Sequence, residues 1–171
     1  AASHQLTVTG TVYDPLTLSA PGVDVVLRSE DGPAVNNDLT ISACASAAIT
    51  STKERAQAVT GTASITSSGD VAITGADRAV GGETLTVDAG GSVTVTGGCA
   101  GASIWRSASI TAAENVTITN TNVEGWAQGT QGIGELTINA GGNVTITGGT
   151  TSNSTLNSAE IACGGELDVR D

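Results

Sequence analysis

The chain repeats one short pattern of apolar and polar residues along most of its length. Six segments read as strand, turn and strand, and a seventh begins near the end; they start at Leu16, Leu39, Ala63, Leu85, Ala108, Leu136 and Leu167. The starts are 23, 24, 22, 23, 28 and 31 residues apart. A recurring period of this length is typical of proteins in which each repeat stacks on the next. The repeat therefore predicts a solenoid.

Apolar residues alternate with polar ones in each segment and predict four inward columns. Side chains two positions apart share one face of a strand. The first strand contributes Leu16, Leu39, Ala63, Leu85, Ala108, Leu136 and Leu167, and then Leu18, Ile41, Ile65, Val87, Ile110, Ile138 and Val169. The second contributes Val23, Ala47, Val71, Val93, Val116 and Val144, and then Val25, Ile49, Ile73, Val95, Ile118 and Ile146. The first segment fits only with a one-residue deletion in its turn.

A third, shorter strand is expected just before each new repeat. Its apolar residues are Val35, Val59, Val80, Ile104, Ile133 and Ile161. The predicted fold class is all-β: a right-handed parallel β-helix with three strands per coil and about seven coils of 22–31 residues. Aromatic residues are only 2% of the chain, which suits a thin core of Val, Ile, Leu and Ala.

The whole chain is expected to be one domain, with a partial coil over residues 1–15 and the β-helix over 16–171. Leu6–Thr9 should be a second strand, and Leu167–Val169 a first strand, so one end would supply what the other lacks. Leu6, Val8, Leu167 and Val169 are thus predicted assembly ends for head-to-tail stacking into a fibre. The alternative is that a longer protein was cut at this boundary.

The formal net charge of −11 argues against binding nucleic acid, whose phosphates would be repelled. No apolar run approaches the roughly 20 residues that span a bilayer, so membrane insertion is not expected. The sequence starts at Ala1 without a signal peptide. We interpret it as a processed mature protein or an excised fragment.

Two segments, Leu85–Gly98 and Leu136–Gly149, read LTVDAGGSVTVTGG and LTINAGGNVTITGG. They resemble the filamentous-haemagglutinin class of bacterial adhesin repeats and the Gly/Thr-rich β-helices of Gram-positive surface proteins, some of which bind carbohydrate. The resemblance implies a secreted or cell-surface location in a bacterium, a structural or adhesive role and no catalysis. It carries over no ligand residues.

Outward threonines form the first candidate surface. Thr94, Thr117 and Thr145 are expected in one column after Asp24, Ala48 and Ala72, and Thr96, Thr119 and Thr147 in the next column after Thr50 and Thr74. Spacings of about 7 Å along a strand and 4.8 Å between strands would make a regular array of hydroxyl groups. Such an array resembles the faces of β-solenoid ice-binding proteins. Threonine also suits any solvated sheet, so a purely structural role stays open.

Long turns form the second candidate surface. Segments 120–132 and 148–160 carry the additional residues of the later repeats. Trp105 and Trp126 should lie near one corner beside Asn120, Asn122 and Gln128, where indole rings could stack on a sugar from host or extracellular glycans. The alternative is that Trp126 folds back to cover the sheet edge.

Catalytic, metal and disulfide sites are not expected. Asp70, Asp77, Asp88, Glu83 and Glu114 fall in different turns, and His4 is the only histidine. We therefore predict no enzyme activity, no cofactor and no dedicated metal site, although acidic turns could bind Ca²⁺ adventitiously. Cys44, Cys99 and Cys163 are placed at three different corners, too far apart for a disulfide.

Overall fold

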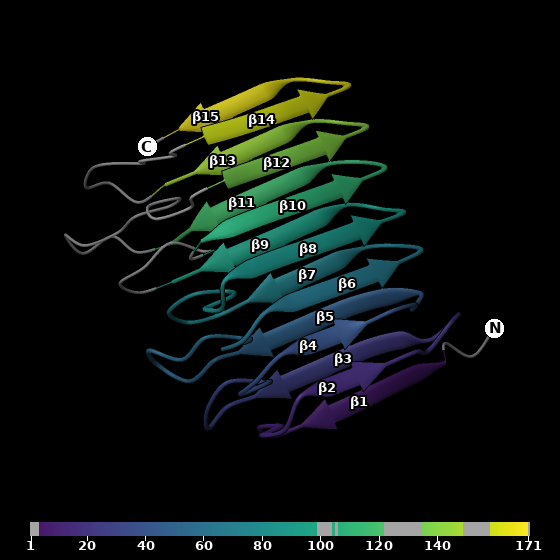
Figure 1. Cartoon of the computed structure of the whole chain (residues 1–171), viewed down its shortest axis with the longest axis vertical. Helices are drawn as coiled ribbons and strands as arrows, with labels where there is room; N and C mark the ends of the chain where they lie inside the picture. Colours follow the sequence, from purple (N-terminus) through teal and green to yellow (C-terminus); the bar gives the residue numbers. More distant parts are fainter. Residues whose placement is uncertain (1–3, 99–103, 105, 122–134, 149–157, 171) are drawn as a thin grey trace.

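The computed structural model describes residues 4–98, 104, 106–121, 135–148 and 158–170. Within these residues the chain forms fifteen β-strands and no helix. The strands make two parallel sheets, one of odd-numbered and one of even-numbered strands. Figure 1 shows them stacked as successive turns of one β-solenoid.

The odd-strand sheet has the order β1-β3-β5-β7-β9-β11-β13-β15. Its strands are β1 (Gln5–Thr9), β3 (Asp24–Ser29), β5 (Ser46–Ser51), β7 (Val71–Thr74), β9 (Val93–Gly97), β11 (Val116–Asn120), β13 (Val144–Thr147) and β15 (Leu167–Arg170).

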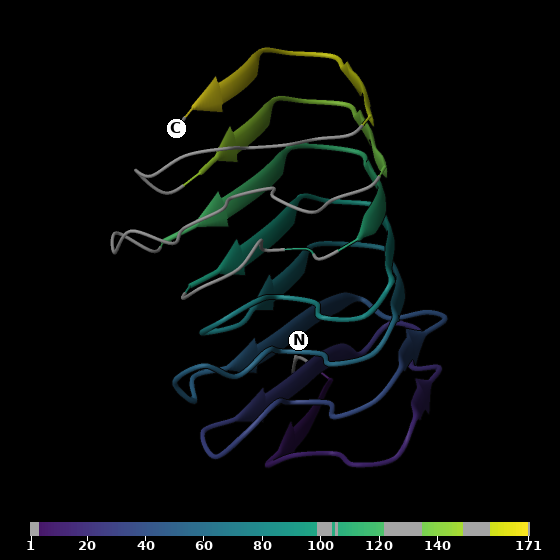
Figure 2. The same cartoon turned by 60° about the vertical axis from the view of Figure 1, so that its left-hand side comes forward.

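The even-strand sheet has the order β14-β12-β10-β8-β6-β4-β2. Its strands are β2 (Leu16–Leu18), β4 (Leu39–Ile41), β6 (Ala63–Ser67), β8 (Thr84–Ala89), β10 (Ser107–Ala112), β12 (Glu135–Ala140) and β14 (Ser158–Cys163). Figure 2 shows the two sheets meeting along one corner of the coils.

Like residues stack on like residues through the interior. Val95, Ile118 and Ile146 pair in register across β9, β11 and β13, and their exposed fractions are 0%, 0% and 3%. Leu85, Ala108 and Leu136 form the matching row across β8, β10 and β12. One coil cannot bury its own apolar face, so each coil depends on its neighbours. The predicted parallel register is confirmed through the central coils.

On the third side of each coil, the paired stretch is too short to form a strand. Val12, Val35, Val59, Val80 and Ile104 pair in one parallel column, as predicted for four of them, but each is an isolated bridge. The chain bends next to Val35, Val59 and Val80, so only one residue of each of these coils pairs with its neighbours on this side. This side still closes the core, because Val35, Val59 and Val80 are fully buried.

The first repeat differs from its predicted alignment. Val25 and Leu27, not Val23 and Val25, pair with Ala47 and Ile49. The turn before β3 therefore contains one residue more than its neighbours, where the sequence alignment had removed one. A tight turn absorbs this residue: the Val23 N–H donates to the Ala20 carbonyl at 3.1 Å, and Gly22 takes a φ of 72° that glycine tolerates.

The last repeat also differs. Ala159 pairs with Leu136, and Leu167 pairs with Val144. Leu167 and Val169 therefore lie on a second strand, not a first, and Ile161 lies on a first strand, not a third. The last repeat starts at Ala159, and the interval from Leu136 is 159 − 136 = 23 residues, not 31. The prediction failed because Leu167 and Val169 repeat the Leu-x-Val spacing of a first strand such as Leu85 and Val87, so Leu167 was taken as the start in place of Ala159.

Polar side chains join successive coils at the corner between the sheets. The Ser92 N–H donates to Asp70 Oδ1 at 2.8 Å, and the Asn143 N–H donates to Asn115 Oδ1 at 2.9 Å. The Glu166 N–H continues the series to Asn143 Oδ1 at 2.9 Å. We call this series the corner ladder. It satisfies backbone donors at a bend where no strand partner is available.

Candidate functional site: the outward hydroxyl faces

The predicted threonine rows lie on the outside of the odd-strand sheet. Thr94, Thr117 and Thr145 pair in register, as do Thr96, Thr119 and Thr147. These six residues are called the threonine face here. The first column continues through Ala72, Ala48 and Val26. Asp24, which the sequence alignment placed there, pairs with Ser46 instead because of the longer first turn.

The threonine face is only partly accessible. Thr94 is exposed, but the other five threonines are half-buried. Neighbouring strands therefore shield much of each side chain, and fewer atoms are free to contact a partner than the sequence pattern indicated.

A second array, which the sequence reasoning missed, lies on the outside of the even-strand sheet. Its central column consists of Thr17, Thr40, Ser64, Thr86, Ser109 and Thr137. These six residues are called the hydroxyl face. All except the half-buried Ser64 are exposed. The signal was present in the sequence, because each residue stands between the two inward apolar residues of a first strand.

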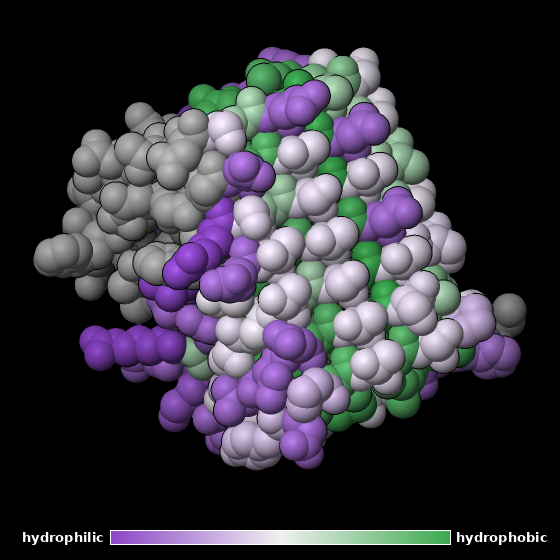
Figure 3. Space-filling view, viewed as in Figure 1, coloured by the Kyte–Doolittle hydropathy of each residue, from purple (hydrophilic) through white to green (hydrophobic). Residues whose placement is uncertain are grey.

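Further hydroxyl groups flank this column. Thr84 pairs with Ser107 on one side, and Thr66 and Thr111 both pair with Asp88 on the other. Figure 3 shows this side of the molecule as rows of side chains of near-neutral hydropathy over the strands. The surface is therefore an ordered array of small polar groups.

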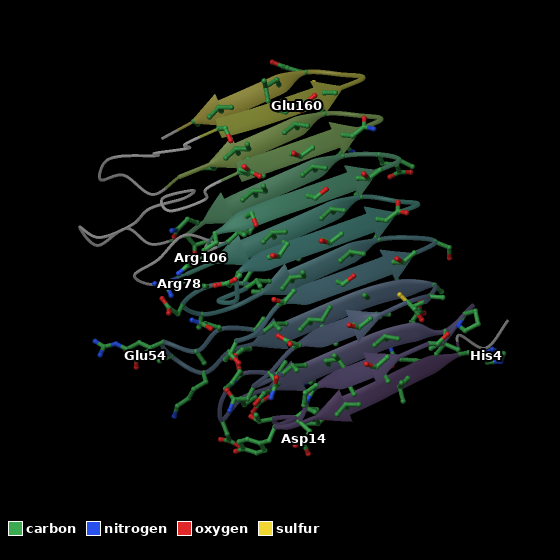
Figure 4. The ribbon with its side chains drawn as sticks, in the orientation of Figure 1. His4, Asp14, Glu54, Arg78, Arg106 and Glu160 are labelled. Carbon is green, nitrogen blue, oxygen red and sulfur yellow. The ribbon has the colours of Figure 1, made fainter. Side chains whose placement is uncertain are left out.

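Few charges interrupt the hydroxyl face. Asp88 stands beside it, and Glu135 and Glu160 lie toward its C-terminal end on β12 and β14. The outward registered positions of the even-numbered strands, from β2 to β14, contain no lysine or arginine. Figure 4 shows the labelled His4, Asp14, Glu54, Arg78 and Arg106 around the edges of the stack.

Most residues predicted to contact a sugar lie outside the described residues. This applies to Trp105, Trp126, Asn122 and Gln128. Asn120 is described and ends β11 in register with Gly97. Its exposed fraction is 3%, so its side chain belongs to the interior and is not available on the surface.

Two of the three cysteines are described, and both are free. Cys44 follows β4, and Cys163 ends β14, so both lie at the corner between the sheets. The prediction that they occupy different corners is wrong, because the last repeat was misaligned. Burial raises the pKa of the Cys44 thiol, a hydrogen bond with Ser67 opposes this, and the negative charge of Asp24 adds to it. Cys99 lies outside the described residues.

Three ion pairs lie on the described surface. Arg106 Nη1 lies 3.7 Å from Glu83 Oε1, and Arg28 pairs with Glu30 at 2.5 Å. Arg170 pairs with Asp168 on β15. In the described part of the chain, no three His, Cys, Asp or Glu residues gather where they could hold a metal ion. No helix among these residues is long and apolar enough to cross a membrane.

Comparison of the chain with protein-family models, with curated proteins and with solved structures gives no match. The structure shows the β-solenoid architecture that the repeats predicted, and no comparison connects the chain with the adhesin repeats that it resembles.

Proposed function

We propose that this chain is a non-enzymatic, extracellular structural and adhesive β-solenoid of a bacterial surface, able to stack end to end with further copies of itself. The observation that carries the proposal is the like-on-like register of successive coils. A continuous interior column and two parallel hydrogen-bonded sheets make a stiff rod, which suits a mechanical role.

The exposed edges of the rod support the stacking. Leu167 and Val169 are core residues by register but are 47% and 59% exposed on β15. At the other end, Leu6 of β1 is 36% exposed. Unpaired edges of this kind attract additional strands. Because β1 and β15 belong to the same sheet, β1 of a second copy would continue the column with Leu6 over Leu167 and Val8 over Val169.

The junction differs from the one that the sequence suggested. The odd-strand sheet has eight strands and the even-strand sheet has seven. Placing β1 of one copy on β15 of another leaves the even-strand sheet one strand short at the junction. The two ends therefore do not complete one coil, and the proposed contact rests on the odd-strand sheet.

Sedimentation velocity over a range of concentrations, together with electron microscopy, tests the stacking. We expect the 171-residue chain to form rods of uniform width. Leu167→Lys places a charge on the apolar edge and should shift the protein toward monomers. Asp168→Asn, which makes the same change in net charge on the outer side of β15, should leave the rods intact.

Circular dichroism would establish that both variants keep the β-sheet fold. A parent chain that stays monomeric at every concentration would contradict the stacking. Equal loss of rods in both variants would show that charge, and not the apolar edge, controls association.

The adhesive part of the proposal concerns extracellular glycans. Its support is the resemblance of the repeats and the tryptophans at 105 and 126. Glycan-array binding that is lost in Trp105→Ala or Trp126→Ala would favour it, and unchanged binding in both would contradict a role for these side chains.

A further inference from the structure

The hydroxyl face repeats with the regularity of the sheet beneath it. Thr86, Ser109 and Thr137 pair in register on adjacent strands, and Thr40 and Ser64 continue the column. Neighbouring strands of a sheet lie about 4.8 Å apart, and alternate residues of one strand about 6.7 Å apart. The hydroxyl groups of the central column therefore recur at a fixed spacing, and Thr84, Ser107, Thr66 and Thr111 add hydroxyl groups on its two sides, with Asp88 between Thr66 and Thr111.

The hydroxyl groups of this column are available to a partner. Within the part of the chain that the structure describes, none of the six side chains makes a hydrogen bond or other polar contact, although their backbones are paired in the sheet. Thr119 of the threonine face, in contrast, has such an interaction. Both accessibility and free hydrogen-bonding capacity thus favour the hydroxyl face over the threonine face.

The chemistry of the face favours a partner that is neutral, flat and periodic. Its central column carries no charge until Glu160, so it offers no matching group to an ionic ligand. Its outward registered positions contain no aromatic side chain, so a sugar ring would find no stacking surface. Hydroxyl groups can hold ordered water, and threonine methyl groups limit how that water arranges itself.

From this array we infer that the hydroxyl face is an ice-binding surface, which adsorbs to a crystal face of frozen water. Ice presents oxygen atoms at repeating positions, so a rigid array can contact many of them at once. The parallel ladders already fix these side chains, which keeps the ordering cost of binding small. The inference is independent of end-to-end stacking, because the sheet face and the rod ends are separate surfaces.

Thermal hysteresis and ice-crystal shape in the intact chain provide the test. The parent protein should show a measurable gap between melting and freezing points and should produce faceted crystals. Thr86→Lys and Ser109→Lys, which place a long charged side chain in the centre of the hydroxyl face, should each lose most of this gap. Thr96→Lys makes the same chemical change on the threonine face and should retain it.

Circular dichroism and sedimentation would show whether each variant keeps its fold and association state. A parent protein without thermal hysteresis would overturn the inference. Loss in Thr96→Lys with retention in Thr86→Lys would also overturn it and assign the activity to the other sheet. Adsorption to microcrystalline cellulose without any effect on ice would identify a polysaccharide as the occupant instead.

Discussion

At the scale of single residues, the corner ladder connects successive coils at a bend where no strand pairing connects them. Each member accepts a backbone N–H from the equivalent position of the next coil, as Asn115 does from Asn143 and Asn143 from Glu166. A single hydrogen bond contributes only about 1 kcal/mol to net stability. The bond matters here because it recurs: the same hydrogen bond fixes the same bend in successive coils.

Asn115→Ala should lower the free energy of unfolding by about 1 kcal/mol, because the Asn143 N–H loses its acceptor. Urea denaturation followed by circular dichroism would measure this. Asn139→Ala is the matched control: Asn139 points outward from β12, and its loss should have little effect. Equal destabilisation by the two substitutions would contradict a specific role for the ladder.

At the scale of the strand, alternation decides which side chains hold the solenoid together. In β11, Val116 and Ile118 are fully buried, whereas Thr117 and Thr119 point outward and are half-buried. The buried residues contact the equivalent residues of the coils above and below. Removing one side chain from such a column leaves a void that rigid neighbouring strands cannot easily close.

Ile118→Ala should therefore cost about 2–5 kcal/mol of stability, the usual range for an Ile-to-Ala change in a packed core. Thr117→Ala, on the opposite side of the same strand, should stay within about 0.5 kcal/mol. Equilibrium urea unfolding of the two variants provides the comparison. A small effect of Ile118→Ala would mean that the interior is more loosely packed than described.

At the scale of the whole molecule, the net charge opposes association between copies of the chain, whereas the apolar edge residues favour it. The net charge of −11 makes copies of the chain repel one another. The exposed Leu167 and Val169 favour contact with a further strand. Charge repulsion acts over about 10 Å at 0.1 M salt and about 3 Å at 1 M, whereas apolar contact does not depend on screening in this way.

The proposed stacking should therefore increase between 0.05 and 1 M sodium chloride, since screening weakens repulsion over a Debye length that falls from more than 10 Å to about 3 Å. Sedimentation velocity at constant protein concentration would detect the change in the fraction of rods. Sodium sulfate at matched ionic strength would show how much of the effect comes from screening alone. A decrease in rods with added salt would indicate that ion pairs, not apolar edges, join the copies.

The sequence by itself determined the solenoid and most of its register. Alternating Val and Ile at fixed intervals can be buried only by stacking equivalent strands, so Val95, Ile118 and Ile146 were correctly placed in one row. The narrow third side was also predicted, because an apolar residue recurs four positions before most repeats. These features depend on local periodicity, which a single sequence carries.

Tertiary structure decided the turn of the first repeat, the alignment of the last repeat and the relative accessibility of the two outer faces. The Gly164–Gly165 pair, which follows β14 as Gly141–Gly142 follows β12, could have revealed the last repeat in the sequence. The accessibility of the two outer faces could not be predicted from the sequence in this way. The exposure of Thr86 and the half-burial of Thr117 depend on side chains of other coils, and only the folded chain brings those together.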